Sequence, residues 1–156
     1  MLRAFIFGPV AVTVGYWEQR GAEVEAGARV EVRRVEYEQI PGAPAGVAGL
    51  RLMPVTHGIW RADLFTGPQG AVYHYHPAFR DGDVGSRFLD DGLTRDPVAW
   101  TIGKLADLPA LVRGSRAADV ADGIHPAEVE QALPQIREAI EQSFAPLEAP
   151  PQAAPA

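Results

Sequence analysis

The hydrophobic pattern of this chain changes period once, near residue 96, and that change limits the possible folds more than any other feature. Before residue 96, apolar side chains alternate with polar or small ones, which is typical of strands with one buried face. The sheet-like half is followed by a half with helical spacing, and this order predicts an α+β fold. We expect an antiparallel curved sheet or partial barrel over residues 2–89, with C-terminal helices packed on it. The helical spacing is clearest at Val129, Leu133, Ile136, Ile140 and Phe144.

The predicted strands cover residues 2–7, 10–16, 28–40, 50–55 and 57–65, followed by one within residues 71–77. The charged, glycine-containing residues 18–27 are interpreted as a loop. The alternation changes phase at Arg33-Arg34, which indicates a β-bulge there. Residues 77–96 are polar and contain several glycines, so we expect a long loop, with a short strand at residues 86–89 as an option.

Helices are predicted at residues 97–106, 108–113 and 115–122, and from Pro126 onward. Asp96-Pro97 is a typical helix start, with an N-cap aspartate followed by proline at the first helical position. The last helix contains Pro134, where we expect a kink or a break, because proline removes a backbone donor and its ring clashes with the preceding turn.

The length and composition suit one globular domain. With 156 residues and 47% apolar residues, we expect a single domain over residues 1–145 and a disordered Pro/Ala-rich tail over residues 146–156. No run of about 18 apolar residues is present, so no membrane span is predicted and a cytoplasmic protein is expected. The chain has one lysine, Lys104, among 14 basic residues and no asparagine, a bias typical of GC-rich bacterial genes.

The absence of cysteine excludes disulfides, thiolate nucleophiles and cysteine-based zinc sites. Any metal would have to be held by histidine, aspartate, glutamate or backbone oxygen. The net charge of −6 argues against a nucleic-acid partner, because phosphate binding needs a basic surface. No glycine-rich phosphate loop, G-x-S-x-G elbow or H-E-x-x-H motif is present.

The main candidate for a functional site is the pair His74-x-His76. In a strand, alternate side chains share a face, so both imidazoles would stand on one side and Tyr73 and Tyr75 on the other. Two imidazoles on one rigid strand can bind a divalent metal such as zinc, iron, nickel or manganese. They can also act as acid–base groups without a metal, or be structural. The sequence leaves these three interpretations open.

The neighbouring strand supplies the other candidates. A four-residue loop at Gly67–Gly70 would place Asp63 opposite His74 and Arg61 opposite His76, whereas a five-residue loop would place Ala62 and Trp60 there. Asp63 and His57 are therefore candidate metal ligands beside the two histidines. Arg61 is a candidate catalytic residue that binds a substrate carboxylate with a bidentate guanidinium, and pairing with the nearby Asp63 is an equal alternative.

Two classes of function remain. The first is a small-molecule enzyme of bacterial metabolism that uses the His-x-His strand, with a divalent metal as an option, for oxygenase, lyase or isomerase/cyclase chemistry. The second is a non-catalytic small-ligand-binding or accessory protein with structural histidines. A small-molecule ligand is the expected partner, and an exposed edge at residues 50–55 leaves a homodimer open.

Overall fold

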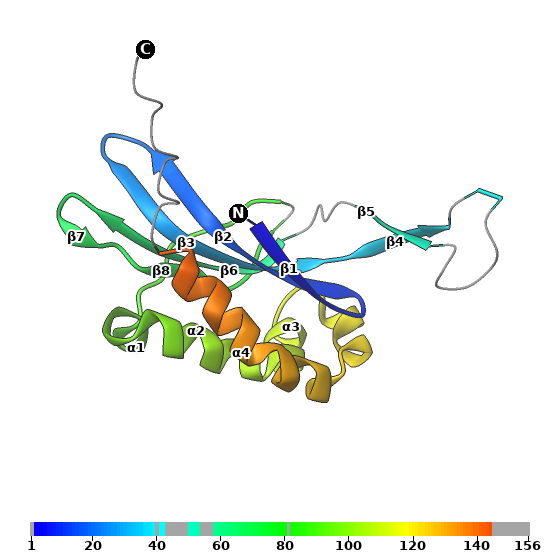
Figure 1. The fold of residues 1–156 in the computed structure, drawn as a ribbon. Coiled ribbons are helices and arrows are strands. Elements are labelled where there is room, and N and C mark those ends of the chain that lie inside the picture. Colours follow the sequence, from blue (N-terminus) through cyan, green and yellow to red (C-terminus); the bar gives the residue numbers. More distant parts are fainter. Residues whose placement is uncertain (1, 40, 43–49, 54–57, 81, 145–156) are drawn as a thin grey trace, which may run out of the picture.

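The strands form one curved, open sheet, and the helices cover one of its faces (Figure 1). This computed structural model describes residues 2–39, 41–42, 50–53, 58–80 and 82–144. The predicted α+β fold is confirmed in both its antiparallel sheet and its C-terminal helices. The sheet does not close into a barrel, because its edges are different strands that do not pair with each other.

All strand pairs of the main sheet are antiparallel. The order is β1-β2-β3-β6-β7, and β8 also pairs with β6. The pairing brings β3 and β6, which are distant in sequence, into the middle of the sheet. The bounds are Leu2–Phe7 for β1, Val10–Arg20 for β2, Val24–Arg34 for β3, Gly58–Gly67 for β6, Gly70–Ala71 for β7 and His74–His76 for β8.

The helices follow the sheet in sequence, and α4 packs directly on β1, β2 and β3. The helix at residues 97–106 is confirmed, and the Asp96 carboxylate accepts a hydrogen bond from Ala99 N. The last helix runs unbroken through Pro134, which is exposed, so the break allowed for there does not occur. The bounds are Asp91–Arg95 for α1, Pro97–Ala106 for α2, Leu108–Arg113 for α3, Ala118–Gly123 for the 3₁₀-helix η2 and Pro126–Gln142 for α4.

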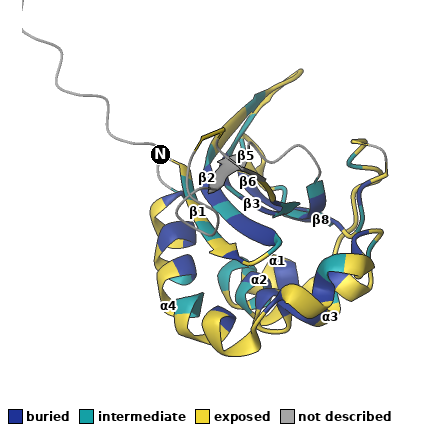
Figure 2. Ribbon diagram, turned by 90° about the vertical axis from the view of Figure 1, so that its right-hand side faces the viewer, coloured by how far each residue is buried: buried dark blue, intermediate teal, exposed yellow. Residues whose placement is uncertain are grey.

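The core includes even-numbered residues of β2, β3 and β6, and Figure 2 colours long stretches of these strands as buried. The register places Val12 opposite Val32 and Val30 opposite Ala62, so apolar side chains of neighbouring strands lie side by side. Burying one such side chain stabilises the fold by about 1.5–3 kcal/mol. Apart from Ile59, which belongs to the core where the β3–β6 register shifts, the odd-numbered residues of the same strands lie on the opposite side, which we call the open face.

The prediction of a loop over residues 18–27 is wrong. Strands β2 and β3 form a hairpin that pairs as far as Arg20 and Val24. Gly27 lies within β3 with φ at 155°, and a Cβ there would approach Leu64 O to 2.2 Å. The glycine therefore permits close contact between β3 and β6. The end of this hairpin extends into solvent, so its composition is charged and resembles that of a loop.

The predicted irregularity near Arg33-Arg34 is present, but the extra residue belongs to the partner strand. The β3–β6 register shifts between Val32 and Arg33, because Val32 pairs with Trp60 and Arg33 with Gly58. The chain then continues into a separate two-stranded hairpin of β4 (Glu36–Gln39) and β5 (Leu50–Met53). The predicted third strand is thus two strands. A homodimer through this region stays a prediction, and the predicted tail lies outside the described residues.

The segment predicted as a long loop contains a short helix. Asp90 caps α1 by accepting hydrogen bonds from Gly92 N and Leu93 N, at 2.7 and 3.2 Å. Leu93 is fully buried and anchors this helix in the core. Near residues 86–89 only a single β-bridge forms, between Phe88 and Tyr75. The aspartates that made this segment look like a polar loop include a helix cap.

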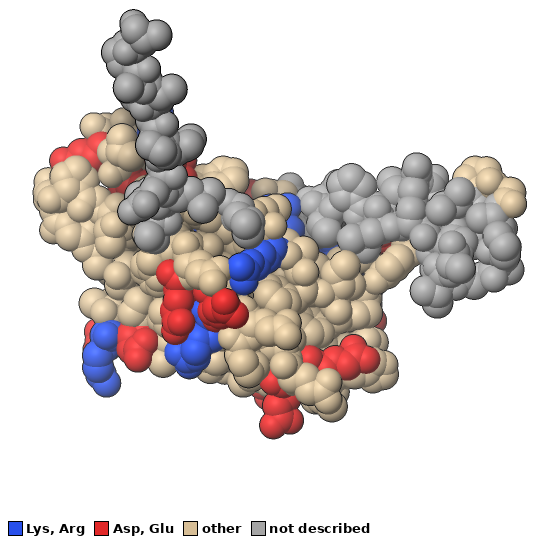
Figure 3. All heavy atoms as spheres, viewed as in Figure 1, with Lys and Arg blue, Asp and Glu red and all other residues tan. Residues whose placement is uncertain are grey.

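Acidic and basic side chains are interspersed over the helix layer on the face seen in Figure 3. One such pair joins Arg137 and Glu141 on successive turns of α4. Among the described residues, no helix combines the length and apolar character needed to cross a membrane.

Candidate metal centre

Pairing between β6 and β8 determines which side chains meet on the open face. Asp63 lies opposite His74 and Arg61 opposite His76, which is the register that a four-residue loop predicts. Tyr75 lies opposite Ala62 and, with Tyr73, packs against the core. The predicted division of the strand between two histidines on one face and two tyrosines on the other is therefore confirmed.

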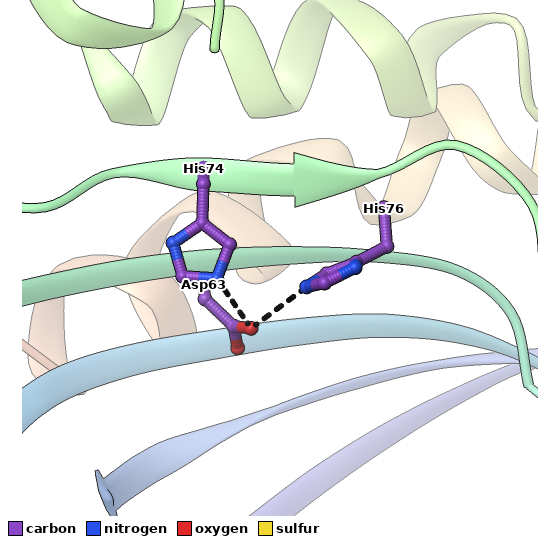
Figure 4. A group of neighbouring side chains, drawn as sticks. All are labelled: Asp63, His74 and His76. Carbon is purple, nitrogen blue, oxygen red and sulfur yellow. Dashed lines mark ion pairs between the residues drawn. The ribbon is translucent and has the colours of Figure 1, made fainter. Parts of the chain in front are cut away.

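Asp63, His74 and His76 form a compact buried group (Figure 4). Their relative exposures are 0%, 2% and 3%. The ligand atoms all lie within 4.8 Å of one another. Asp63 Oδ2 lies 3.3 Å from His74 Nε2 and 3.7 Å from His76 Nε2. Two imidazole nitrogens and one carboxylate oxygen thus converge on one point, and the group could hold a metal ion.

The His74 ring lies between two hydrogen-bond acceptors. Its Nδ1 donates to Val72 O at 2.8 Å, because a carbonyl oxygen can only accept. The other nitrogen, Nε2, faces the Asp63 carboxylate. A cation placed between the two groups would contact both the Nε2 nitrogen and the carboxylate oxygen. A backbone carbonyl that fixes the tautomer in this way is typical of metal-binding histidines.

Two arginines hold the Asp63 carboxylate. Arg29 Nε donates to Oδ1 at 2.6 Å, and Arg61 Nε lies 3.0 Å from Oδ2. Burial alone would raise the pKa of Asp63, but the contact with His74 and the hydrogen bond from Arg29 outweigh it, so the pKa lies below its ordinary value. Asp63 is therefore a carboxylate at neutral pH and can serve as a ligand.

Arg61, the predicted substrate-binding residue, lies within the group itself. Its guanidinium contacts Asp63, approaches Glu31 Oε1 at 3.6 Å and lies 3.4 Å from His76 Nε2. Burial lowers the pKa of Arg61, and Asp63 opposes that effect. With two acidic neighbours, Arg61 already has the carboxylate contacts that a substrate would otherwise supply.

His76 has an environment that favours its neutral form. Burial and the nearby Arg61 guanidinium lower its pKa, and Asp63 only partly opposes them. Its Nδ1 is buried and makes no hydrogen bond of normal geometry with the described residues. A neutral imidazole with an unprotonated nitrogen is the form that binds a metal or accepts a proton.

One predicted ligand, His57, lies outside the described residues. Two contributors were missed, Arg29 and Glu31, which come from β3 and face the group from across β6. A signal for them does exist: Arg29, Glu31 and Arg33 alternate with Ala28, Val30 and Val32, a charged row opposite an apolar one.

The residues around the group adjoin an aromatic ring, Phe79, and a hollow on the open face. Phe79 packs against Gly58, where a Cβ would approach the ring to 1.7 Å, and the Arg61 guanidinium lies 5.8 Å from the ring centroid. Arg29 and Glu31 also line a hollow of about 480 Å³ on the open face. Such a volume suits a small-molecule ligand.

Comparisons of this chain with protein-family models, with curated proteins and with solved structures gave no match. The function must therefore be argued from the geometry.

Proposed function

We propose that this protein is a small-molecule enzyme that binds a divalent transition metal, of the class of zinc, iron, nickel or manganese, through Asp63, His74 and His76. One observation carries the proposal: three donor atoms converge from two paired strands, while His74 Nδ1 is fixed by Val72 O. Two histidines and one carboxylate are a common ligand set for catalytic metals, because three protein ligands leave coordination positions for substrate or water.

The two arginines are compatible with this role. Arg29 uses Oδ1 of Asp63 and leaves Oδ2, the oxygen that faces both Nε2 atoms. Arg61 Nε also contacts Oδ2, and its guanidinium lies 3.4 Å from His76 Nε2, so metal binding requires Arg61 to shift away from the ligand atoms. After that shift its charge would still lie near the ligand set and would favour an anionic substrate. A bound metal would supply Lewis-acid polarisation of a carbonyl or enol oxygen, which suits oxygenase, lyase or isomerase/cyclase chemistry.

A second candidate is acid–base catalysis by the same group without a metal. The observation that favours it is His76, whose pKa is lowered by burial and by Arg61 and whose Nδ1 makes no hydrogen bond of normal geometry with the described residues. A neutral His76 would then accept a proton from the substrate, with the Arg61 charge stabilising the anion that forms. The metal-free proposal involves the same residues but needs a different experiment.

Metal content decides between the two. The protein would be purified without a histidine tag, and zinc, iron, nickel and manganese would be measured by elemental analysis before and after dialysis against each ion. We expect about one metal per chain in the native protein, lost in both His74→Ala and His76→Ala. The matched control is His125→Ala, because His125 is exposed at the start of α4 and its side chain makes no capping hydrogen bond.

Equal metal content in native protein and in both histidine variants would reject the metal site. Circular dichroism of each variant shows whether loss of metal reflects loss of fold. If the native protein binds no metal at any tested ion, the metal-free version remains, and the pH dependence of stability described below addresses it.

A further inference from the structure

The hollow on the open face lies directly beside the candidate metal centre. It is formed over β1, β2 and β3, and its volume of about 480 Å³ exceeds the need of a few ordered waters. One lining residue, Arg29, bonds to Asp63 of the metal-centre group, and a second, Glu31, approaches Arg61, which contacts Asp63. The hollow and the centre therefore share a wall. The lining residues are Leu2, Thr13, Gly15, Tyr16, Trp17, Arg29, Glu31 and Arg33.

Arg29 is held in a geometry suited to binding an anion. Its guanidinium carbon lies 4.4 Å from the Trp17 ring centroid and 5.3 Å from that of Phe65. The Nε donates to Asp63, whereas the two terminal nitrogens make no hydrogen bond within the described ranges of the chain. These two nitrogens are parallel donors, and such a pair matches the two oxygens of a carboxylate. The side chain is thus preorganised, and a ligand would not have to order it.

The remaining wall is aromatic and apolar, and part of it is exposed. Trp17 has a relative exposure of 49% and Leu2 of 73%. Each is a large apolar side chain left in water at the edge of a concave surface, and a ligand that covered them would gain the free energy of their burial. Charge and shape together therefore favour a ligand with a carboxylate at one end and a flat apolar body at the other.

We propose that this hollow binds a small organic acid, with the carboxylate on the terminal nitrogens of Arg29 and a planar apolar body against Trp17. The inference rests on the proposed function for its catalytic meaning, because it names the substrate class of that enzyme. Arg29 would join the two sites: its Nε positions the Asp63 carboxylate, and its terminal nitrogens hold the acid beside that group. The sequence suggested Arg61 for binding a carboxylate, but Arg61 already contacts Asp63 and Glu31. We infer this role for Arg29, because only its Nε is used by Asp63.

The test is calorimetric titration of the full chain with four aromatic acids, benzoate, cinnamate, indole-3-acetate and 2-naphthoate, each compared with its neutral amide. Titrations are made on chelator-treated protein and again with zinc added. We expect at least one acid to bind about tenfold or more tightly than its amide, since a charged hydrogen-bonded pair contributes on that scale. The preference should disappear in Arg29→Gln, and affinity for acid and amide alike should fall in Trp17→Ala.

Arg29→Gln removes a partner of buried Asp63, so its folding must be checked, whereas Trp17→Ala alters a half-exposed side chain and keeps the test valid if Arg29→Gln unfolds. Arg113→Gln is the control, because it removes an exposed arginine that pairs with Asp122 far from the hollow in the fold. No preference for acid over amide in any pair, or affinity unchanged in Trp17→Ala, overturns the inference. A preference found in protein that never binds metal upholds the hollow and rejects the metal-dependent function, so the two failures are distinguishable.

Discussion

Both faces of the β6 strand contain fully buried residues, which are held by opposite kinds of interaction. Leu64 and Asp63 are neighbours in sequence, and both have a relative exposure of 0%. Leu64 faces the helices and packs among apolar side chains. Asp63 faces the other way and is surrounded by Arg29, Arg61 and His74. One strand therefore shows what a buried position needs when the neighbours are apolar and when they are charged.

The difference lies in specificity. Apolar burial is non-directional and scales with area, so the helix-covered face tolerates other apolar side chains of similar volume. Burying a charge has a cost in lost hydration, which only well-placed partners of opposite charge offset. Removing one partner therefore costs more free energy than the pair contributes. Matched buried charges are costly, so a purely structural role is a weak explanation for them. We therefore propose that the function lies on the open face.

The largest expected effect comes from breaking the charged side. Asp63→Asn leaves the Arg29 and Arg61 guanidiniums buried without their shared carboxylate, and we expect a loss of about 3 to 5 kcal/mol in the free energy of unfolding. Urea unfolding monitored by circular dichroism measures it. The control is Asp122→Asn, which removes the exposed partner of Arg113 and should change stability by less than about 1 kcal/mol.

A second variant makes this prediction specific. Asp63→Asn combined with Arg29→Gln removes one charge of each sign, and we expect it to be more stable than the sum of the two single changes implies. If the two losses simply add, the two side chains are not coupled, and the distinction drawn between the two faces fails.

A substitution on the apolar face should cause a similar loss of stability but leave metal binding unchanged. Leu64→Ala removes a fully buried side chain from the core, and we expect a loss of about 2 to 5 kcal/mol. Metal content per folded chain should stay at the native value, because the side chain points away from Asp63. Elemental analysis at a temperature where the variant is folded checks this. Loss of metal in folded Leu64→Ala would show that the two faces are not independent.

The alternation of side chains was predictable, and it accounts for most of the fold and half of the site. Period-two spacing places Trp60, Ala62 and Leu64 in the core, and His74 and His76 together on the other face. Two hairpin registers fit the sequence, because loops of four and five residues are both common. The structure has the register that places Tyr75 beside Ala62 and packs it against the core. Local patterns cannot select this register, since it depends on what packs above the sheet.

The contribution of β3 was not predictable from local patterns. Arg29 and Asp63 are 34 residues apart, and periodicity within a strand does not report which strand lies beside it. Residues 18–27 were predicted as a loop, so the full length of the β2–β3 hairpin was not expected. This hairpin brings Trp17 into contact with Arg29. Charged residues alternating with valines predicted a two-sided strand, but only the sheet order shows that its charges face Asp63.

The smallest expected effect is a dependence of stability on pH that arises on the charged face alone. The folded-state pKa of His76 lies below its ordinary value, first because of burial and then because of Arg61, with Asp63 opposing and His74 adding to the decrease. In the unfolded chain a histidine has a pKa of about 6.5. Between the folded and the unfolded pKa the unfolded state binds more protons, so stability falls as the pH is lowered through about 6.5, with a slope of at most about 1.4 kcal/mol per pH unit.

In chelator-treated protein, His76→Gln should flatten this slope, measured by urea unfolding between about pH 7.5 and pH 5, while His125→Gln serves as the control for losing one histidine. Parallel slopes for native protein and His76→Gln would mean that His76 takes up its proton equally in both states, and the metal-free proposal for His76 as a base would lose its support.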